Sequence, residues 1–134
     1  MRINKNVFKF IENELYNYDD IKKELTLYKE EILEGENKPD VAVQGGIGDK
    51  TANKAVKMVS SKFVLQSEKA IHAIEKSLVM LDGKYRLLFK LKYQDCLPWQ
   101  EVILEMGVSD RSYFRLRREL VTVVGQELGI INAM

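Results

Sequence analysis

The sequence predicts an all-α protein, and three observations support this fold class. The 134 residues include only two prolines, and 46% of them are hydrophobic, which is enough to form a core. Apolar residues recur three and four positions apart through most of the chain, as they do on one face of an α-helix. Between these runs lie Gly, Pro, Ser and Asp residues, which commonly begin or end helices. This length fits one domain, or one domain with an appendage.

Residues 1–34 form an N-terminal helical segment in this prediction. Two helices are expected, with a break at "NYDD", where Asp19 or Asp20 would cap the second helix. One long kinked helix is the alternative. Gly35 is expected to end the segment. The apolar positions of the two runs are Ile3, Val7, Phe10, Ile11, Leu15, Ile21, Leu25, Tyr28 and Ile32.

Residues 35–50 are predicted to be a flexible connector, because "GENKPDVAVQGGIGDK" holds four glycines and one proline and has no helical period. The glycine-rich "GGIGDKT" also invites comparison with a phosphate-binding loop. That loop requires Gly immediately before its Lys, whereas Asp49 precedes Lys50 here, and no buried strand comes before it. A hinge is therefore expected, without ATP binding.

Residues 51–134 are predicted to be a long helix followed by a C-terminal DNA-binding domain. The long helix spans Thr51 to Leu81 and needs a partner for its apolar stripe, either the N-terminal helices or a second copy of the chain. "LDGK" then breaks it. The stripe consists of Val56, Val59, Phe63, Ala70, Ile74, Leu78 and Leu81.

Three further helical runs complete the chain. The first spans Tyr85 to Asp95. The second is the short helix "WQEVILEM", with Pro98 in its first turn and Gly107 ending it. The third runs from about residue 110 to 128, with Ser109 as its cap and Gly129 after its end. The side chains of the first run that should face inward are Tyr85, Leu87, Leu88 and Leu91.

A short helix, a tight turn containing Gly and a longer helix make up the helix-turn-helix pattern. At about 100° per residue, the last helix has two opposite faces. Its apolar face consists of Tyr113, Leu116, Leu120 and Val124, and its basic face of Arg111, Arg115, Arg118 and Thr122. Exposed arginines usually form only a solvated surface. Here the turn, the cap and the preceding helix all favour contact with DNA in the major groove.

Several neighbours of the basic face allow two interpretations each. Ser112 and Phe114 flank it, and Phe114 either contacts DNA or packs on the helix before Pro98. Gln100 is a candidate for a phosphate contact, whereas Trp99 is expected to anchor the core. Arg117 lies beside the apolar face, so a structural role is expected. It would cover the core with its stem, or pair with Glu101 or Glu105 of the preceding helix.

Other classes of function are excluded by what the chain lacks. Cys96 and His72 are the only residues of their kinds, so we expect neither a zinc site, a catalytic triad nor a cofactor, and no enzymatic activity. The single cysteine and the absence of a long apolar run predict a cytoplasmic protein without a signal peptide or a membrane span.

The stretch "YRLLFKLKYQDCLPWQEVILEMGVSDRSYFRLRRELVTVVGQELG" resembles region 4 of sigma factors. It resembles the RinA and ArpU families of bacteriophage late transcriptional regulators more closely, through "LKY", Trp99 and "GVSDRSYFRLRRE". "GDKTANKAVK" is also similar to the RinA pattern, and the resemblance covers roughly residues 44 to 130. The chain departs from such motifs at Ile103, where a small residue is usual, and at Pro98, where Ser or Thr is common.

The resemblance implies a DNA-binding transcriptional activator of late phage genes. Its DNA contacts would come from Gln100, Arg111, Ser112, Phe114, Arg115 and Arg118. Its partners would be promoter DNA and bacterial RNA polymerase. A dimer is also expected, because one module with few phosphate contacts should bind DNA weakly. The alternatives are a small terminase-like subunit that binds a packaging site, and a helix-turn-helix that binds an acidic protein.

Overall fold

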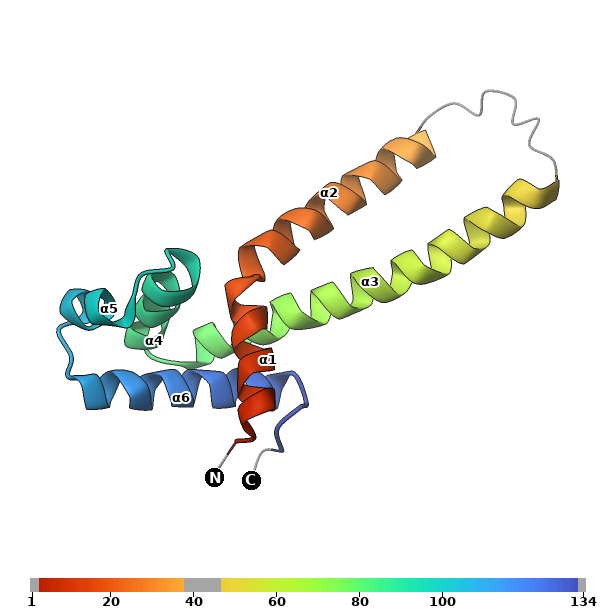
Figure 1. Ribbon diagram of the computed structural model, residues 1–134. Helices are drawn as coiled ribbons and strands as arrows, with labels where there is room; N and C mark the ends of the chain where they lie inside the picture. The colour runs from red at the N-terminus through yellow and green to blue at the C-terminus, as the bar shows by residue number, and fades with distance from the viewer. Residues whose placement is uncertain (1–2, 38–46, 133–134) are drawn as a thin grey trace.

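The computed structural model describes the backbone of residues 3–37 and 47–132, and the side chains of residues 3–31 and 62–132. Every regular element in these ranges is helical, which confirms the predicted fold class. Two helices form a long arm, and the others gather at one end of it (Figure 1). The elements are α1 (Lys5–Tyr16), α2 (Tyr18–Asn37), α3 (Ile47–Met80), α4 (Gly83–Leu88), a π-helical turn η1 (Phe89–Gln94), α5 (Trp99–Met106) and α6 (Asp110–Glu127).

The predicted break between two N-terminal helices is present, but it lies at Asn17. Asn17 closes α1 by donating its backbone N–H to the Asn13 carbonyl, 2.9 Å away. Asp19 and Asp20 therefore lie inside the first turn of α2, so the prediction that one of them caps the helix was wrong. In the first turn, their negative charges interact favourably with the helix dipole. Gly35 does not end the segment, because α2 continues to Asn37.

Helices α2 and α3 run side by side along the arm (Figure 1). An edge-to-face contact between Tyr28 and Phe63, with ring centroids 5.7 Å apart, and an ion pair between Lys29 and Glu68 at 2.7 Å join them. The N-terminal helices thus supply the partner that the long helix was expected to need. Helix α3 begins at Ile47, inside the predicted connector, and residues 38–46 of that connector lie outside the described residues. So do the side chains of Val56 and Val59.

The core lies where α1, the last turns of α3, α4, η1, α5 and α6 meet. Ile74, Leu88 and Val102 are fully buried there. Leu87 was predicted to face inward, yet it is 40% exposed, because the buried side of α4 runs through Tyr85 and Leu88 and continues to Phe89 in η1. The other predicted inward residues, Tyr85, Leu88 and Leu91, are buried.

Helix α1 and the segment after α6 come very close to α6 at Gly125. A Cβ atom there would lie 2.5 Å from Ile131 Cδ1 and 2.7 Å from Ile11 Cδ1, so the ends of both isoleucine side chains would have to move to make room for it. The glycine thus allows these two side chains to pack directly against the backbone of α6. This contact fixes one end of α6 to the rest of the core.

The boundaries of the last two helices agree with the prediction. Gly107 ends α5 in the left-handed conformation, with φ of 67°, and Gly129 after α6 has φ of 77°. Ser109 caps α6, its hydroxyl oxygen accepting the Ser112 N–H at 3.2 Å. Pro98 lies just before α5, and its carbonyl accepts the N–H of Val102 at 3.1 Å. Among the described helices, none is long and apolar enough to span a membrane.

Candidate nucleic-acid interface

The outward side of α6 gathers the predicted site residues of that helix around one open hollow of about 630 Å³. Arg111, Arg115 and Arg118 are exposed, and so is Phe114 at 43%. We call this surface the arginine face, and it consists of Ser109, Arg111, Ser112, Phe114, Arg115 and Arg118. Gln100 is exposed on α5 but does not line the hollow.

The opposite side of α6 holds the arginine face in place. Tyr113, Leu116, Leu120 and Val124 are each at most 2% exposed, as the predicted apolar face requires. Burying four such side chains fixes the rotation of α6 about its own axis, since any large turn would expose them to water. The three arginines are therefore presented to solvent by the packing of the fold, and they take no part in the core.

Arg115 lies near a carboxylate one turn further along the helix. Its Nε lies 3.9 Å from Glu119 Oε1, and the Tyr85 hydroxyl donates to the other oxygen of Glu119. Burial and the neighbouring Glu119 raise the pKa of Tyr85 to about 12, so the hydroxyl stays protonated at neutral pH. The spacing of Arg115 and Glu119 was visible in the sequence as an i,i+4 pair, but the contribution of Tyr85 was not.

Arg117 has the structural role that was expected, but with a different partner. Its Nε and Nη2 donate to the two oxygens of Glu12 on α1, at 2.9 Å and 2.6 Å. The Tyr93 hydroxyl donates to the same carboxylate at 2.6 Å, and the Phe8 ring lies 4.9 Å from the guanidinium carbon. The predicted partners Glu101 and Glu105 were wrong, because Arg117 points toward α1 and η1 instead of α5. This bidentate pair joins α1 to α6.

The Glu12 carboxylate remains ionised in this setting. Burial alone would raise the pKa of Glu12, but hydrogen bonds from Arg117 and Tyr93 outweigh burial and hold it below its usual value. The same contacts raise the pKa of Arg117 and, with burial, that of Tyr93. Both donors therefore keep their protons at neutral pH. The pair is a fixed part of the fold, so Arg117 is not available to a ligand.

The aromatic residues beside the arginine face differ from the prediction. Trp99 was expected to anchor the core, yet it is 37% exposed and stacks on the buried Tyr113 with ring centroids 6.5 Å apart. Phe114 packs against Trp99, at 5.7 Å, instead of against the helix before Pro98. The two exposed rings form one apolar edge of the arginine face, between α5 and α6.

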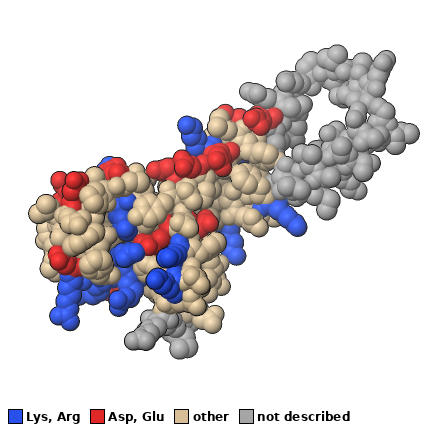
Figure 2. Space-filling model, in the orientation of Figure 1, with Lys and Arg blue, Asp and Glu red and all other residues tan. Residues whose placement is uncertain are grey.

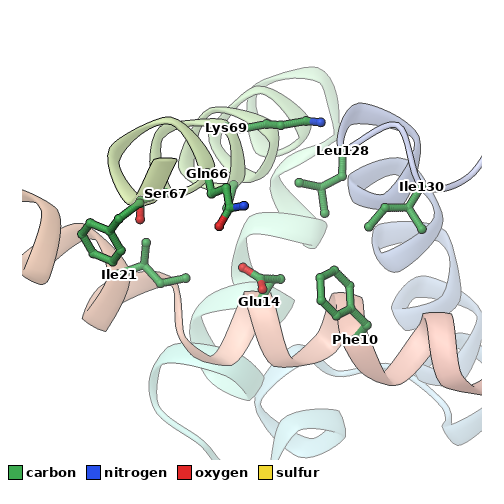
Figure 3. Close-up of a pocket in the computed structure, with 10 residues that line it drawn as sticks. Phe10, Glu14, Ile21, Gln66, Ser67, Lys69, Leu128 and Ile130 are labelled. Atoms are coloured by element: carbon green, nitrogen blue, oxygen red, sulfur yellow. The ribbon is translucent and has the colours of Figure 1, made fainter. Parts of the chain in front are cut away.

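A second hollow, of about 500 Å³, lies between α1, α2, α3 and the segment after α6 (Figure 3). Phe10, Leu128 and Ile130 line it with apolar surface. The Glu14 carboxylate stands in its wall, and burial raises the pKa of that carboxylate. Across the described part of the chain, no cluster of three or more metal-ligating side chains was found.

Basic side chains gather along one edge of the helical end of the molecule. Figure 2 shows them at the lower edge of this end, with acidic atoms above and beside them. Comparisons of the chain with models of protein families, with curated proteins and with solved structures found no match. The functional proposal therefore depends on the chemistry of the arginine face and on the sequence pattern around it.

Proposed function

We propose that the protein binds double-stranded DNA in a sequence-specific manner and activates transcription of late phage genes, with α6 in the major groove. One observation carries this proposal: three exposed guanidinium groups project from one side of a helix whose other side is buried in the core. A helix presented in this way fits the major groove, which is about 12 Å wide. The order of the elements supports the proposal, because a short helix, a turn at Gly107 and a longer helix follow one another as in DNA-binding helix pairs.

The side chains of the arginine face suit both parts of DNA recognition. Each guanidinium group can donate two parallel hydrogen bonds, to O6 and N7 of guanine or to a phosphate. Ser112 can donate to a phosphate, and the exposed edge of Phe114 can contact a thymine methyl group. Gln100, at the start of α5, would contact a phosphate if α5 crosses the DNA backbone as the first helix of such a pair does.

The transcriptional part of the proposal comes from the resemblance to late phage regulators. An activator of this kind would bind promoter DNA and RNA polymerase in the bacterial host. One arginine face contacts few base pairs, so a dimer is proposed to supply the affinity and the site length that a single α6 lacks.

The decisive experiment is selection of bound duplexes from a random pool, followed by titration of the selected duplex in low salt with fluorescence anisotropy. We expect Arg115→Ala to weaken binding to the selected site by about 1–3 kcal/mol. Arg115→Lys keeps the positive charge but loses the planar guanidinium group that donates two parallel hydrogen bonds. Compared with Arg115→Ala, it should therefore regain affinity for phosphate, but it should not distinguish the selected duplex from one in which guanine is replaced by another base.

The matched control is Lys23→Ala, which removes one exposed positive charge from α2, away from the arginine face. It should leave the affinity for the selected duplex within about twofold, since it removes no contact with DNA. If the unmodified protein enriches no sequence and binds no duplex in low salt, the proposed function is wrong. Equal losses for Lys23→Ala and Arg115→Ala would also contradict it.

A further inference from the structure

The hollow between α1, α2, α3 and the segment after α6 collects large apolar side chains that the fold leaves partly exposed. Phe10 is 50% exposed, Ile130 is 42% exposed and Phe63 is 37% exposed, and all three line the hollow. The buried Ala70 and Leu128 form part of its wall. Apolar side chains from separate segments that meet in one concave surface are typical of a ligand site, and a volume of about 500 Å³ is in the range of such sites.

One carboxylate stands in this apolar hollow without a positive partner. Among the residues whose side chains are described, no ion pair includes Glu14. Burial raises the pKa of Glu14, and in the described part of the chain no basic neighbour offsets this effect. Carboxylates that lose contact with water are usually paired in proteins. The fold therefore keeps an unfavourable negative charge here, as binding sites often do for a ligand of opposite charge.

The groups around Glu14 are polar without being charged. In Figure 3, the Glu14 carboxylate faces the Gln66 side chain across the hollow, and Ser67 lies on the same helix as Gln66. Lys69 is the other charged residue of the lining, but it extends along α3 toward Leu128 and away from Glu14. The interior thus offers one negative charge, two neutral polar side chains and apolar walls.

We propose that this hollow binds a small organic cation that carries an ammonium group on an apolar body, with the ammonium paired to Glu14. The body would pack against Phe10 and Ile130, and the face of the Phe10 ring also attracts a positive charge. An ammonium group has three N–H donors, so the oxygens of Gln66 and Ser67 can accept those that Glu14 leaves free. The hollow shares no residue with the arginine face, so this inference stands independently of DNA binding.

Three compounds of similar shape and different charge test the proposal. Phenethylammonium, phenethyl alcohol and hydrocinnamate are titrated into isotope-labelled protein at pH 7, and amide chemical shifts are followed by NMR. The ammonium compound should shift the amides around Phe10, Glu14 and Ser67. It should bind about tenfold more tightly than the alcohol, because a hydrogen bond between two charged groups is stronger than one between neutral groups. Hydrocinnamate, which is an anion, should be repelled by Glu14.

Three outcomes of this titration would overturn the inference. They are equal affinity for the ammonium compound and the alcohol, tighter binding of hydrocinnamate, and chemical-shift changes confined to other parts of the protein.

Glu14→Gln tests the role of the carboxylate with little change in shape. It should weaken binding of phenethylammonium by about tenfold and leave binding of phenethyl alcohol unchanged, which would show that the hollow is intact. The matched control is Glu24→Gln, which removes an exposed carboxylate of α2 outside the lining. Its affinity should stay within about twofold, since exposed charges away from the ligand contribute little. Lys69→Gln should bind equally well or slightly more tightly, because it removes a like charge from the rim.

The pH dependence of binding supplies a signature that a purely apolar hollow would lack. Among the lining residues only Glu14 and Lys69 titrate, and Lys69 stays protonated below neutral pH, as the ammonium compound does. Affinity should therefore fall between pH 7 and pH 4, as Glu14 is protonated at a pKa that burial raises above 4.5. Glu14→Gln should bind with the same low affinity at both pH values. A pH-independent affinity of the unmodified protein, or equal losses for Glu14→Gln and Glu24→Gln, would overturn the inference.

Discussion

Arg117 and Arg118 are neighbours in the sequence with opposite roles in the structure. The side chain of Arg117 is 28% exposed and pairs with Glu12, whereas Arg118 is exposed on the arginine face. Removing Arg117 leaves a buried carboxylate without its partner, so Arg117→Ala should lower the free energy of unfolding by about 2–3 kcal/mol. Arg118→Ala should change it by less than about 0.5 kcal/mol. Urea denaturation followed by circular dichroism measures both.

The order of the two variants should reverse when affinity for DNA is measured under conditions in which both proteins are folded. Arg118→Ala should weaken binding to the selected duplex, and Arg117→Ala should bind it as the unmodified protein does. A variant of Arg117 that is stable but cannot bind DNA would show that this arginine contacts the ligand. That result would contradict the structural role given to it here.

Glu12 and Glu14 lie on the same helix, and their stability effects should depend on pH with opposite signs. The pKa of Glu12 is lowered in the folded protein, so its stabilising effect is present above its unfolded value of 4.5 and is lost as pH falls through the folded value. Glu12→Gln should therefore destabilise the protein strongly at pH 7 and much less at pH 3. Unfolding free energies from urea titrations at the two pH values test this.

Glu14 provides the matched control, because burial raises its pKa in the folded protein. Folding then favours the protonated form, and that contribution is present below 4.5 and is lost as pH rises through the folded value. Glu14→Gln should stabilise the protein at pH 7 by less than about 1 kcal/mol, since the carboxylate keeps some contact with water. The gain should disappear at pH 3. Equal pH dependence for both variants would contradict these assignments.

At the scale of helices, local signals in the sequence predicted the ends that depend on backbone conformation. Ser109 and Gly107 act through their own side chain or their own φ angle, so their positions suffice to place the turn between α5 and α6. Gly35 gave a wrong boundary, because a glycine only lowers helix stability and α2 continues through it. The spacing of apolar residues did not predict the π-helical turn at Phe89–Gln94, which was expected to be part of one continuous helix.

Gly107→Ala tests how much the turn between α5 and α6 depends on left-handed backbone. A Cβ at this glycine would meet nothing within 4 Å, so the whole cost comes from holding alanine at φ of 67°. The free energy of unfolding should fall by about 1 kcal/mol, measured by urea denaturation. Gly83→Ala is the control, because its Cβ would meet only the Arg86 side chain at 3.6 Å, an ordinary contact. A loss for Gly83 as large as for Gly107 would exclude backbone strain as the cause.

For the whole molecule, the sequence predicted which arginines of α6 are exposed, but it did not predict the contacts between helices that hold α6 in place. A helical wheel separates Arg111, Arg115 and Arg118 from the apolar face, because that separation depends only on the geometry of one helix. The partner of Arg117 lies 105 residues away in the sequence, and it depends on how α1 packs against α6. Trp99 was misplaced for the same reason, since its exposure is set by how α5 and α6 pack.

The distribution of charge over the molecule makes a prediction about the salt dependence of the proposed DNA binding. The net charge is only +1, but three arginines share one face of α6. If each arginine displaces one counterion from the duplex, the logarithm of the affinity should fall with the logarithm of salt concentration with a slope of about −3 for one protomer. A dimer that engages two arginine faces should give about −5 to −6. Anisotropy titrations in increasing KCl, with sedimentation of the complex, measure slope and stoichiometry together.

Arg118→Ala should reduce the slope by about one for each bound protomer, because one phosphate contact is lost. Lys23→Ala should leave it unchanged, although it alters the net charge of the protein by the same amount. This comparison separates a local contact from a general effect of charge. A slope near zero for the unmodified protein, or equal changes for the two variants, would show that the arginine face does not lie on the phosphate backbone.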